Sequence, residues 1–92
     1  MDAMTTAGIR ANIADSRARS ADSGTGARIR TNHPEIAARI QEAAVRAYRA
    51  RDEAIDAATP EAAREAATRA EQAADEAWAA LRAARAAGKH RA

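Results

Sequence analysis

The chain has 92 residues, enough for one small domain. Alanine supplies 31 of its 43 hydrophobic residues and phenylalanine is absent, so a thick β-sandwich or α/β core cannot be filled. This excludes most enzyme scaffolds. The net charge of +2 is too small for a strong electrostatic field, and the lack of cysteine excludes disulfides and thiolate metal sites.

The alanine content predicts an all-α fold, because alanine is the best helix former and lets helix backbones approach closely. The segment Met1-Asp2-Ala3-Met4-Thr5-Thr6 has neither the basic flank nor the apolar stretch of an export signal. No stretch has the large apolar side chains of a membrane span. We therefore expect a cytoplasmic protein that does not bind membranes.

Residues 1–33 differ in composition from the rest of the chain. They contain 12 of the 15 Ser, Thr, Gly and Asn residues and all of the net positive charge. This composition predicts a largely disordered, flexible arm. Ile9 and Ile13 lie one helical turn apart after two threonines that can act as a cap, which indicates a short helix over residues 6–18. At about a dozen residues, such a helix needs a partner surface to persist.

Two further features of the arm are weaker signals. Residues 27–31 can be interpreted as a short strand, although they hold one isoleucine and have no visible pairing partner. Gly24-Thr25-Gly26 lacks the Lys-Ser/Thr ending of a phosphate-binding loop, so it indicates a linker.

Residues 34–88 carry two helix-start signals. Asn32 is a candidate cap before Pro34 and Glu35, and Thr59 precedes Pro60 in the same way. These signals predict helices over about 34–58 and 60–87, followed by a basic tail over 89–92. The alternative is one continuous helix through the second proline, but an interior proline costs about 3 kcal/mol and usually kinks a helix.

Both helices show residues at the alternating three- and four-residue spacing of a coiled-coil seam. A short connection between them predicts an antiparallel, alanine-rich, coiled-coil-like hairpin. We call these residues the predicted seam; they are Ala37, Ile40, Ala44, Ala47, Tyr48, Arg51, Ile55, Ala63, Ala67, Ala70, Ala74, Ala77, Trp78 and Leu81.

Arg51 is the one charged residue of the predicted seam. Its stem can lie along alanine while its guanidinium reaches Glu71 or solvent, or it can make a specificity contact with a second copy. Alanine also buries too little surface to hold a lone hairpin together. We therefore expect a further partner, which is a second copy, another protein, or the short helix of the same chain.

The sequence offers few groups for chemistry. His33 stands at a predicted helix start and His90 in the basic tail, and we interpret them as capping or solvated residues. No histidine spacing or Asp-rich loop indicates a metal, and acids one turn apart are interleaved with arginine, as on solvated faces. We expect no enzymatic activity, no metal or cofactor, and no small-molecule substrate.

Two functional hypotheses remain. The first is a protein–protein interaction or assembly module that self-associates or docks on a partner through the predicted seam. The alternative is a nucleic-acid-associated accessory protein whose basic residues contact phosphates. The candidate phosphate contacts are Arg10, Arg17, Arg19, Arg28, Arg30, Arg82, Arg85, Lys89 and Arg91.

Overall fold

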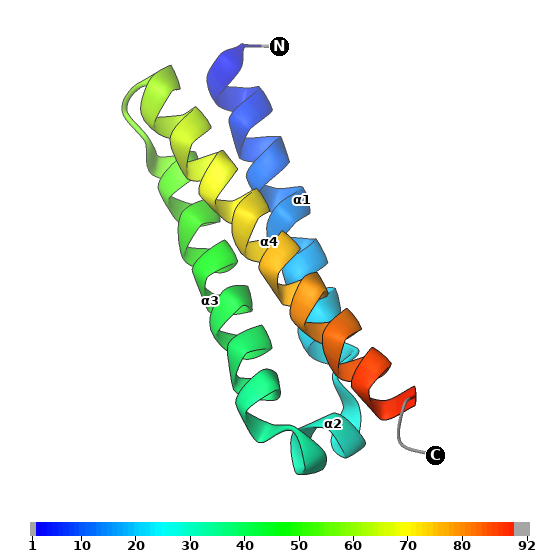
Figure 1. Ribbon diagram of the computed structural model, residues 1–92. Helices are drawn as coiled ribbons and strands as arrows, with labels where there is room; N and C mark the ends of the chain where they lie inside the picture. Colours follow the sequence, from blue (N-terminus) through cyan, green and yellow to red (C-terminus); the bar gives the residue numbers. More distant parts are fainter. Residues whose placement is uncertain (1, 90–92) are drawn as a thin grey trace.

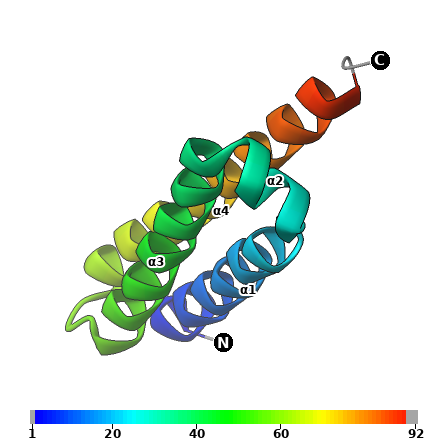
Figure 2. The ribbon, with the colours of Figure 1, turned by 90° about the horizontal axis from the view of Figure 1, so that it is seen from below.

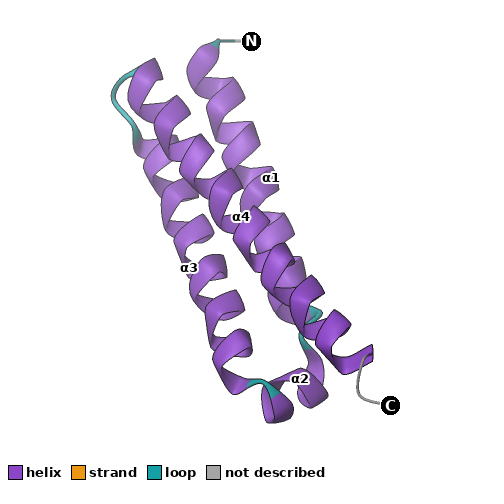
Figure 3. Cartoon of the chain, in the orientation of Figure 1, coloured by secondary structure: helices purple, strands orange, loops and turns teal. Residues whose placement is uncertain are grey.

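The computed structural model describes residues 2–89, which form α1 (Ala3–Ser23), α2 (Gly26–Asn32), α3 (Pro34–Asp56) and α4 (Pro60–Lys89). No strand occurs over this range, and the all-α prediction is confirmed. The three long helices lie side by side in a bundle of 52 × 17 × 15 Å, with α3 antiparallel to both α1 and α4 (Figures 1 and 3). The short α2 crosses one end of the bundle between α1 and α3 (Figure 2). None of the four helices is long and apolar enough to cross a membrane.

The structure corrects the expectation of a disordered arm over residues 1–33. The helix there runs from Ala3 to Ser23 rather than over 6–18, and the segment considered as a strand lies in α2. α1 packs against both α3 and α4. Its buried face consists mainly of alanines at four- and three-residue spacing, each at most 1 % exposed: Ala7, Ala11, Ala14, Ala18 and Ala21. Contact with two helices supplies the stabilisation that an isolated helix of this length lacks.

The two isoleucines that indicated a helix in the arm do not form its contact face. Ile9 is 43 % exposed and Ile13 is 57 % exposed. They lie off the alanine face of α1 because the spacing of that face, not residue size, decides which side meets α3 and α4. α3 and α4 are therefore two of the three long helices of a bundle that α1 completes.

α1 is capped by Asp2, not by the threonines that the sequence suggested as caps. The Asp2 carboxylate accepts a hydrogen bond of 2.7 Å from the backbone N–H of Thr5. This bond satisfies one of the free donors in the first turn of the helix. Because it favours the ionised carboxylate, it lowers the pKa of Asp2 below the usual 3.8.

The depressed pKa of Asp2 predicts that the first turn of α1 frays in acid. A carboxyl group whose pKa is lower in the folded state stabilises the fold above its unfolded pKa. That contribution is lost as the pH falls from 3.8 through the lower folded value. The protection factor of the Thr5 amide, which compares its exchange rate with that of an unfolded peptide at the same pH, should therefore fall on acidification. Asp2→Asn, which caps without titrating, should remove this fall, and a protection factor in the native chain that does not change with pH would contradict the capping role.

The connection between α3 and α4 follows the helix-start signal in the sequence. The Thr59 hydroxyl accepts a hydrogen bond of 3.1 Å from the backbone N–H of Ala62, and the chain turns over residues 57–59 instead of continuing through Pro60 as one helix. At the start of α3 the cap position is occupied by His33 rather than Asn32, and no side chain there bonds the first turn. Pro34 tolerates this arrangement because it has no N–H to satisfy.

The core of the bundle is built mainly from alanine. Along most of the bundle the buried apolar side chains where the three long helices meet are alanines, with Met4 partly buried against them. The only large apolar side chains that are fully buried within residues 2–89 are Ile40 and Leu81, which pack with Ala21, Ala43 and Ala77. This small core allows the helices to lie close together, so interhelical polar contacts gain importance in fixing their register.

Candidate functional site

The residues of the predicted seam differ in their exposure to solvent. Its alanines and its two large aliphatic residues Ile40 and Leu81 are buried, whereas Tyr48 and Ile55 are 47 % and 54 % exposed. Trp78 and Arg51 are half-buried. The buried members are Ala37, Ile40, Ala44 and Ala47 of α3 and Ala63, Ala67, Ala70, Ala74, Ala77 and Leu81 of α4. We call the surface of α3 and α4 that α1 covers the seam.

A buried ion pair connects α1 to the seam. The side chain of Asp15 is fully buried, and its Oδ2 atom accepts hydrogen bonds from Arg51 at 3.0 Å and from Arg19 at 2.7 Å. Oδ1 of the same carboxylate is buried without a hydrogen-bond partner among the described residues. Asp15 was not identified from the sequence. It lies beside the alanine stripe of α1 and pairs with Arg51 of α3, the one charged residue of the predicted seam.

Arg51 contacts three groups at this site. Besides Asp15, it bonds the carboxylate of Asp52 at 3.0 Å, and its guanidinium carbon lies 4.5 Å from the centre of the Tyr48 ring. The hydrogen bond to Asp52, together with the charges of Asp15 and Asp52, raises the pKa of Arg51. Arg51 does not reach Glu71, the partner that the sequence suggested, because α1 brings a closer carboxylate into the seam.

The edge between α1 and α4 carries a second group of polar contacts. Arg10 forms a two-pronged ion pair with Glu71, and Arg17 pairs with Asp75 at 3.1 Å. The bond to Glu71 raises the pKa of Arg10. The indole N–H of Trp78 donates to the backbone carbonyl of Arg17 at 2.9 Å. These contacts fix how far α1 slides along α4.

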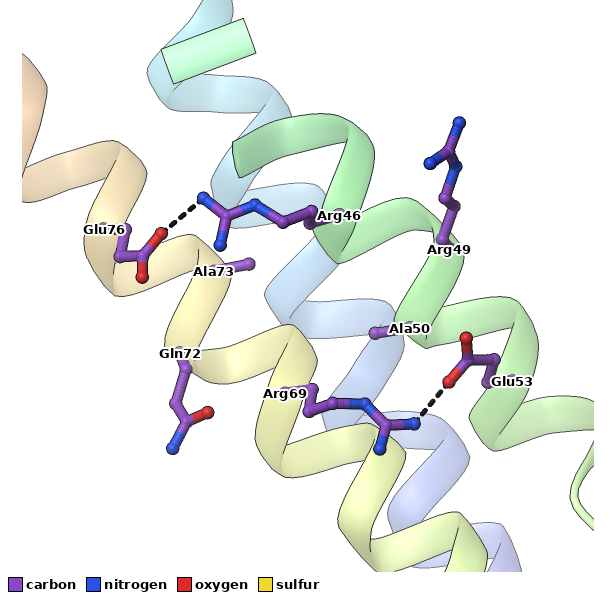
Figure 4. A pocket seen from close by; sticks show the side chains of 8 residues that line it. All are labelled: Arg46, Arg49, Ala50, Glu53, Arg69, Gln72, Ala73 and Glu76. Carbon is purple, nitrogen blue, oxygen red and sulfur yellow. Dashed lines mark hydrogen bonds and ion pairs between the residues drawn. The ribbon is translucent and has the colours of Figure 1, made fainter. Parts of the chain in front are cut away.

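The outer groove between α3 and α4 is bridged by charged side chains (Figure 4). Arg46 pairs with Glu76 and Arg69 pairs with Glu53 across a floor that includes Ala50 and Ala73. The side chains of Arg49 and Gln72 point away from this floor in Figure 4. The arrangement ties two helices together, and its charged groups neutralise each other in pairs.

The predicted phosphate contacts are scattered over the bundle. Arg10, Arg17, Arg19 and Arg30 each pair with an aspartate or glutamate. Arg28, Arg82 and Arg85 are exposed and have no acidic partner within residues 2–89; the side chain of Lys89 and all of Arg91 lie outside the described part of the chain.

Arg85 has a structural role at the end of α1. A Cβ atom built on Gly24 would lie only 3.4 Å from its Nη2 atom, which places the guanidinium beside the carboxyl end of α1. The last turn of α1 has no basic residue of its own. A cation at this end interacts favourably with the helix dipole.

Over residues 2–89 no group of three or more His, Cys, Asp or Glu side chains is arranged to hold a metal ion. His33 lies at the end of α2, and His90 is outside the described range. Comparisons with protein-family models, curated proteins and solved structures found no match. The clearest candidate site is the seam, together with α1, which packs on it.

Proposed function

We propose that the chain is a small, non-enzymatic protein–protein interaction or assembly module that self-associates or docks on a partner through its alanine-lined helical seam. The observation that carries this proposal is the way α1 is held. An alanine-faced helix lies along the seam, and its alanines at positions 7, 11, 14, 18 and 21 are at most 1 % exposed. The seam of α3 and α4 is therefore a surface suited to accept a helix.

Charges on the seam give this surface its selectivity. Arg51 lies within it, while Glu71 and Asp75 line its α1 edge. A helix that fits must carry small residues at three- and four-residue spacing, a carboxylate opposite Arg51, and cations along one edge. Charged positions that flank an apolar seam choose the partner and its orientation in the same way in coiled coils.

The outer surface of the bundle supports association as well. Five large apolar side chains are 42–57 % exposed, whereas the core is filled with alanine: Ile9, Ile13, Val45, Tyr48 and Ile55. A chain that had to be stable only as a monomer would gain more free energy by burying these side chains. Their placement on α1 and α3 leaves apolar surface for a neighbouring molecule.

Sedimentation of the purified protein over a range of concentrations tests the proposal. We expect concentration-dependent dimers whose amount does not change when duplex DNA is added at low or moderate salt. A monomer at every concentration that also binds no helix carrying the α1 sequence would contradict it.

Nucleic-acid association is the second candidate, favoured by one observation. Arg28 in α2 and Arg82 near the end of α4 lie at the same end of the bundle and are exposed without an acidic partner in the described chain. Phosphate contacts there would produce complexes that weaken steeply with salt. Complexes lost in Arg28→Gln/Arg82→Gln but kept in Arg49→Gln, a change elsewhere on the surface, would support this candidate over the first.

A further inference from the structure

We propose that the helix in the seam is exchangeable: the α1 of a second copy replaces the chain's own α1 and gives a domain-swapped dimer with two complete α1 sites. This inference rests on the proposed function, in which the seam accepts an alanine-faced helix. It adds the identity of the occupant, which is α1 itself supplied by another molecule of the same chain.

The first argument concerns the kind of contacts that hold α1. Its fully buried residues are alanines and Asp15, and Met4 packs partly buried against the alanine core. The ion pairs at its edge are partly exposed, with 36 % of the Arg10 side chain and 46 % of the Arg17 side chain accessible. Exposed ion pairs contribute little and are screened by salt. The α1 of a second copy carries the same side chains, so it restores every contact that release of the chain's own α1 gives up.

The second argument concerns the segment that joins α1 to α3. None of the residues of α2 is buried, and Gly26 at its start has a φ of +73°, a conformation that other residues rarely adopt. Ile29 of α2 packs partly buried against the cluster of Ile40 and Leu81, and buried Thr25 donates its hydroxyl hydrogen bond to the carbonyl of Ala21, within the end of α1. The other residues over 24–33 are not buried, so extension of this segment removes few core contacts. Short connections of this kind act as hinges when protomers exchange an identical element.

The third argument selects α1 as the occupant. Arg51 lies in the seam and Asp15 is its buried counter-ion, with Oδ1 of Asp15 enclosed and without a hydrogen-bond partner in the described chain. A helix that lacks a carboxylate at this position leaves Arg51 without one of its hydrogen-bond partners. The α1 of a second copy brings that carboxylate, and it also brings the arginines that match Glu71 and Asp75.

Two charge-reversal variants test the exchange. In Asp15→Arg or Arg51→Asp alone, like charges meet inside the bundle whenever α1 closes on its own chain. In an equimolar mixture, a swapped heterodimer pairs the two reversed residues in one site and native Asp15 with native Arg51 in the other. We expect each variant alone to lose helicity, and the co-refolded mixture to regain it and to sediment at twice the mass of one chain.

The control is the double variant Asp15→Arg/Arg51→Asp, which restores an opposite-charge pair within one chain and should fold without a partner. A folded double variant beside a mixture that equals the average of its two components would overturn the exchange. If the native protein still self-associates in that case, the proposed function stands and only the identity of the occupant is wrong.

A second variant remains informative if the reversed side chains prevent folding altogether. Deletion of residues 24–33 joins Ser23 directly to Pro34, so α1 has no connection with which to fold back onto its own chain. We expect a helical dimer whose α1 helices occupy each other's seams. A helical monomer or an unfolded chain would overturn the proposal.

Discussion

Ala70→Glu is expected to abolish the helical fold. Ala70 is fully buried on the face of α4 that meets the other helices. Glutamate there forces the helices apart, at about 1–3 kcal/mol, and encloses an uncompensated charge, at about 3–5 kcal/mol. Together these costs are comparable to the whole stability of a domain at the lower end of the usual range of about 5–15 kcal/mol, where a core made of alanine places this chain. Far-UV circular dichroism should report the loss of helix.

Gln72→Glu is the matched control. It adds the same negative charge two residues away on the same helix, but position 72 is exposed. The change should alter stability by no more than about 0.5 kcal/mol. If both variants melt like the native protein, position 70 does not face the core and the packing of α4 described above is wrong.

Arg51→Met should destabilise the bundle without unfolding it completely. Methionine keeps much of the apolar stem, but fully buried Asp15 then retains Arg19 as its only cationic partner among residues 2–89. Removing one partner from a buried charge costs about 3 kcal/mol, because the remaining charge has already lost its hydration. Denaturant unfolding followed by circular dichroism measures the loss.

The double variant Asp15→Ala/Arg51→Met tests whether the stability lost in Arg51→Met comes from leaving the Asp15 carboxylate without that partner. It removes both charges, and alanine at position 15 continues the alanine face of α1. Replacing a buried pair by apolar residues is often neutral for stability. We therefore expect the double variant to be more stable than Arg51→Met alone. A double variant that is less stable than either single change would contradict the proposed coupling.

The buried faces of α3 and α4 could be predicted from the sequence, because each helix repeats small residues at the three- and four-residue spacing of one helical face. Alanines such as Ala44, Ala67 and Ala74 are buried as that spacing indicates. Tyr48 and Ile55 were assigned to the same seam but are about half exposed. The helical period alone cannot place such flanking residues, because the position of a third helix decides which flank is covered.

α1 was predicted only as a short helix over residues 6–18 within a flexible arm, although the signal for its packed face is present in the sequence. Ala7, Ala11, Ala14 and Ala18 repeat the stripe that identified α3 and α4, but serines, threonines and arginines between them favoured a flexible arm. Those polar residues occupy the outer surface of α1 and do not affect its packing face. The stripe predicts that a helix has an apolar side, and in this chain that signal outweighs the average composition of the segment.

The Asp15–Arg51 pair shows what a single sequence cannot specify. Arg51 stood out as a charge on an apolar stripe, and the sequence left Glu71, solvent or a second copy as the group that its guanidinium meets. Several acids are candidates, and Glu71 lies close to the pairing line of a two-helix hairpin. The choice of Asp15 depends on the register of α1 against α3, which follows from the contacts of α1 with two helices at once.

Amide hydrogen exchange tests most directly whether α1 is a packed helix of the bundle. We predict that the amides of Ala11, Ala14 and Ala18 exchange nearly as slowly as those of Ala44 and Ala74, because all five residues lie in one cooperative core. Exchange in α1 at the rate of an unfolded chain, beside slow exchange in α3 and α4, would contradict the structure described above.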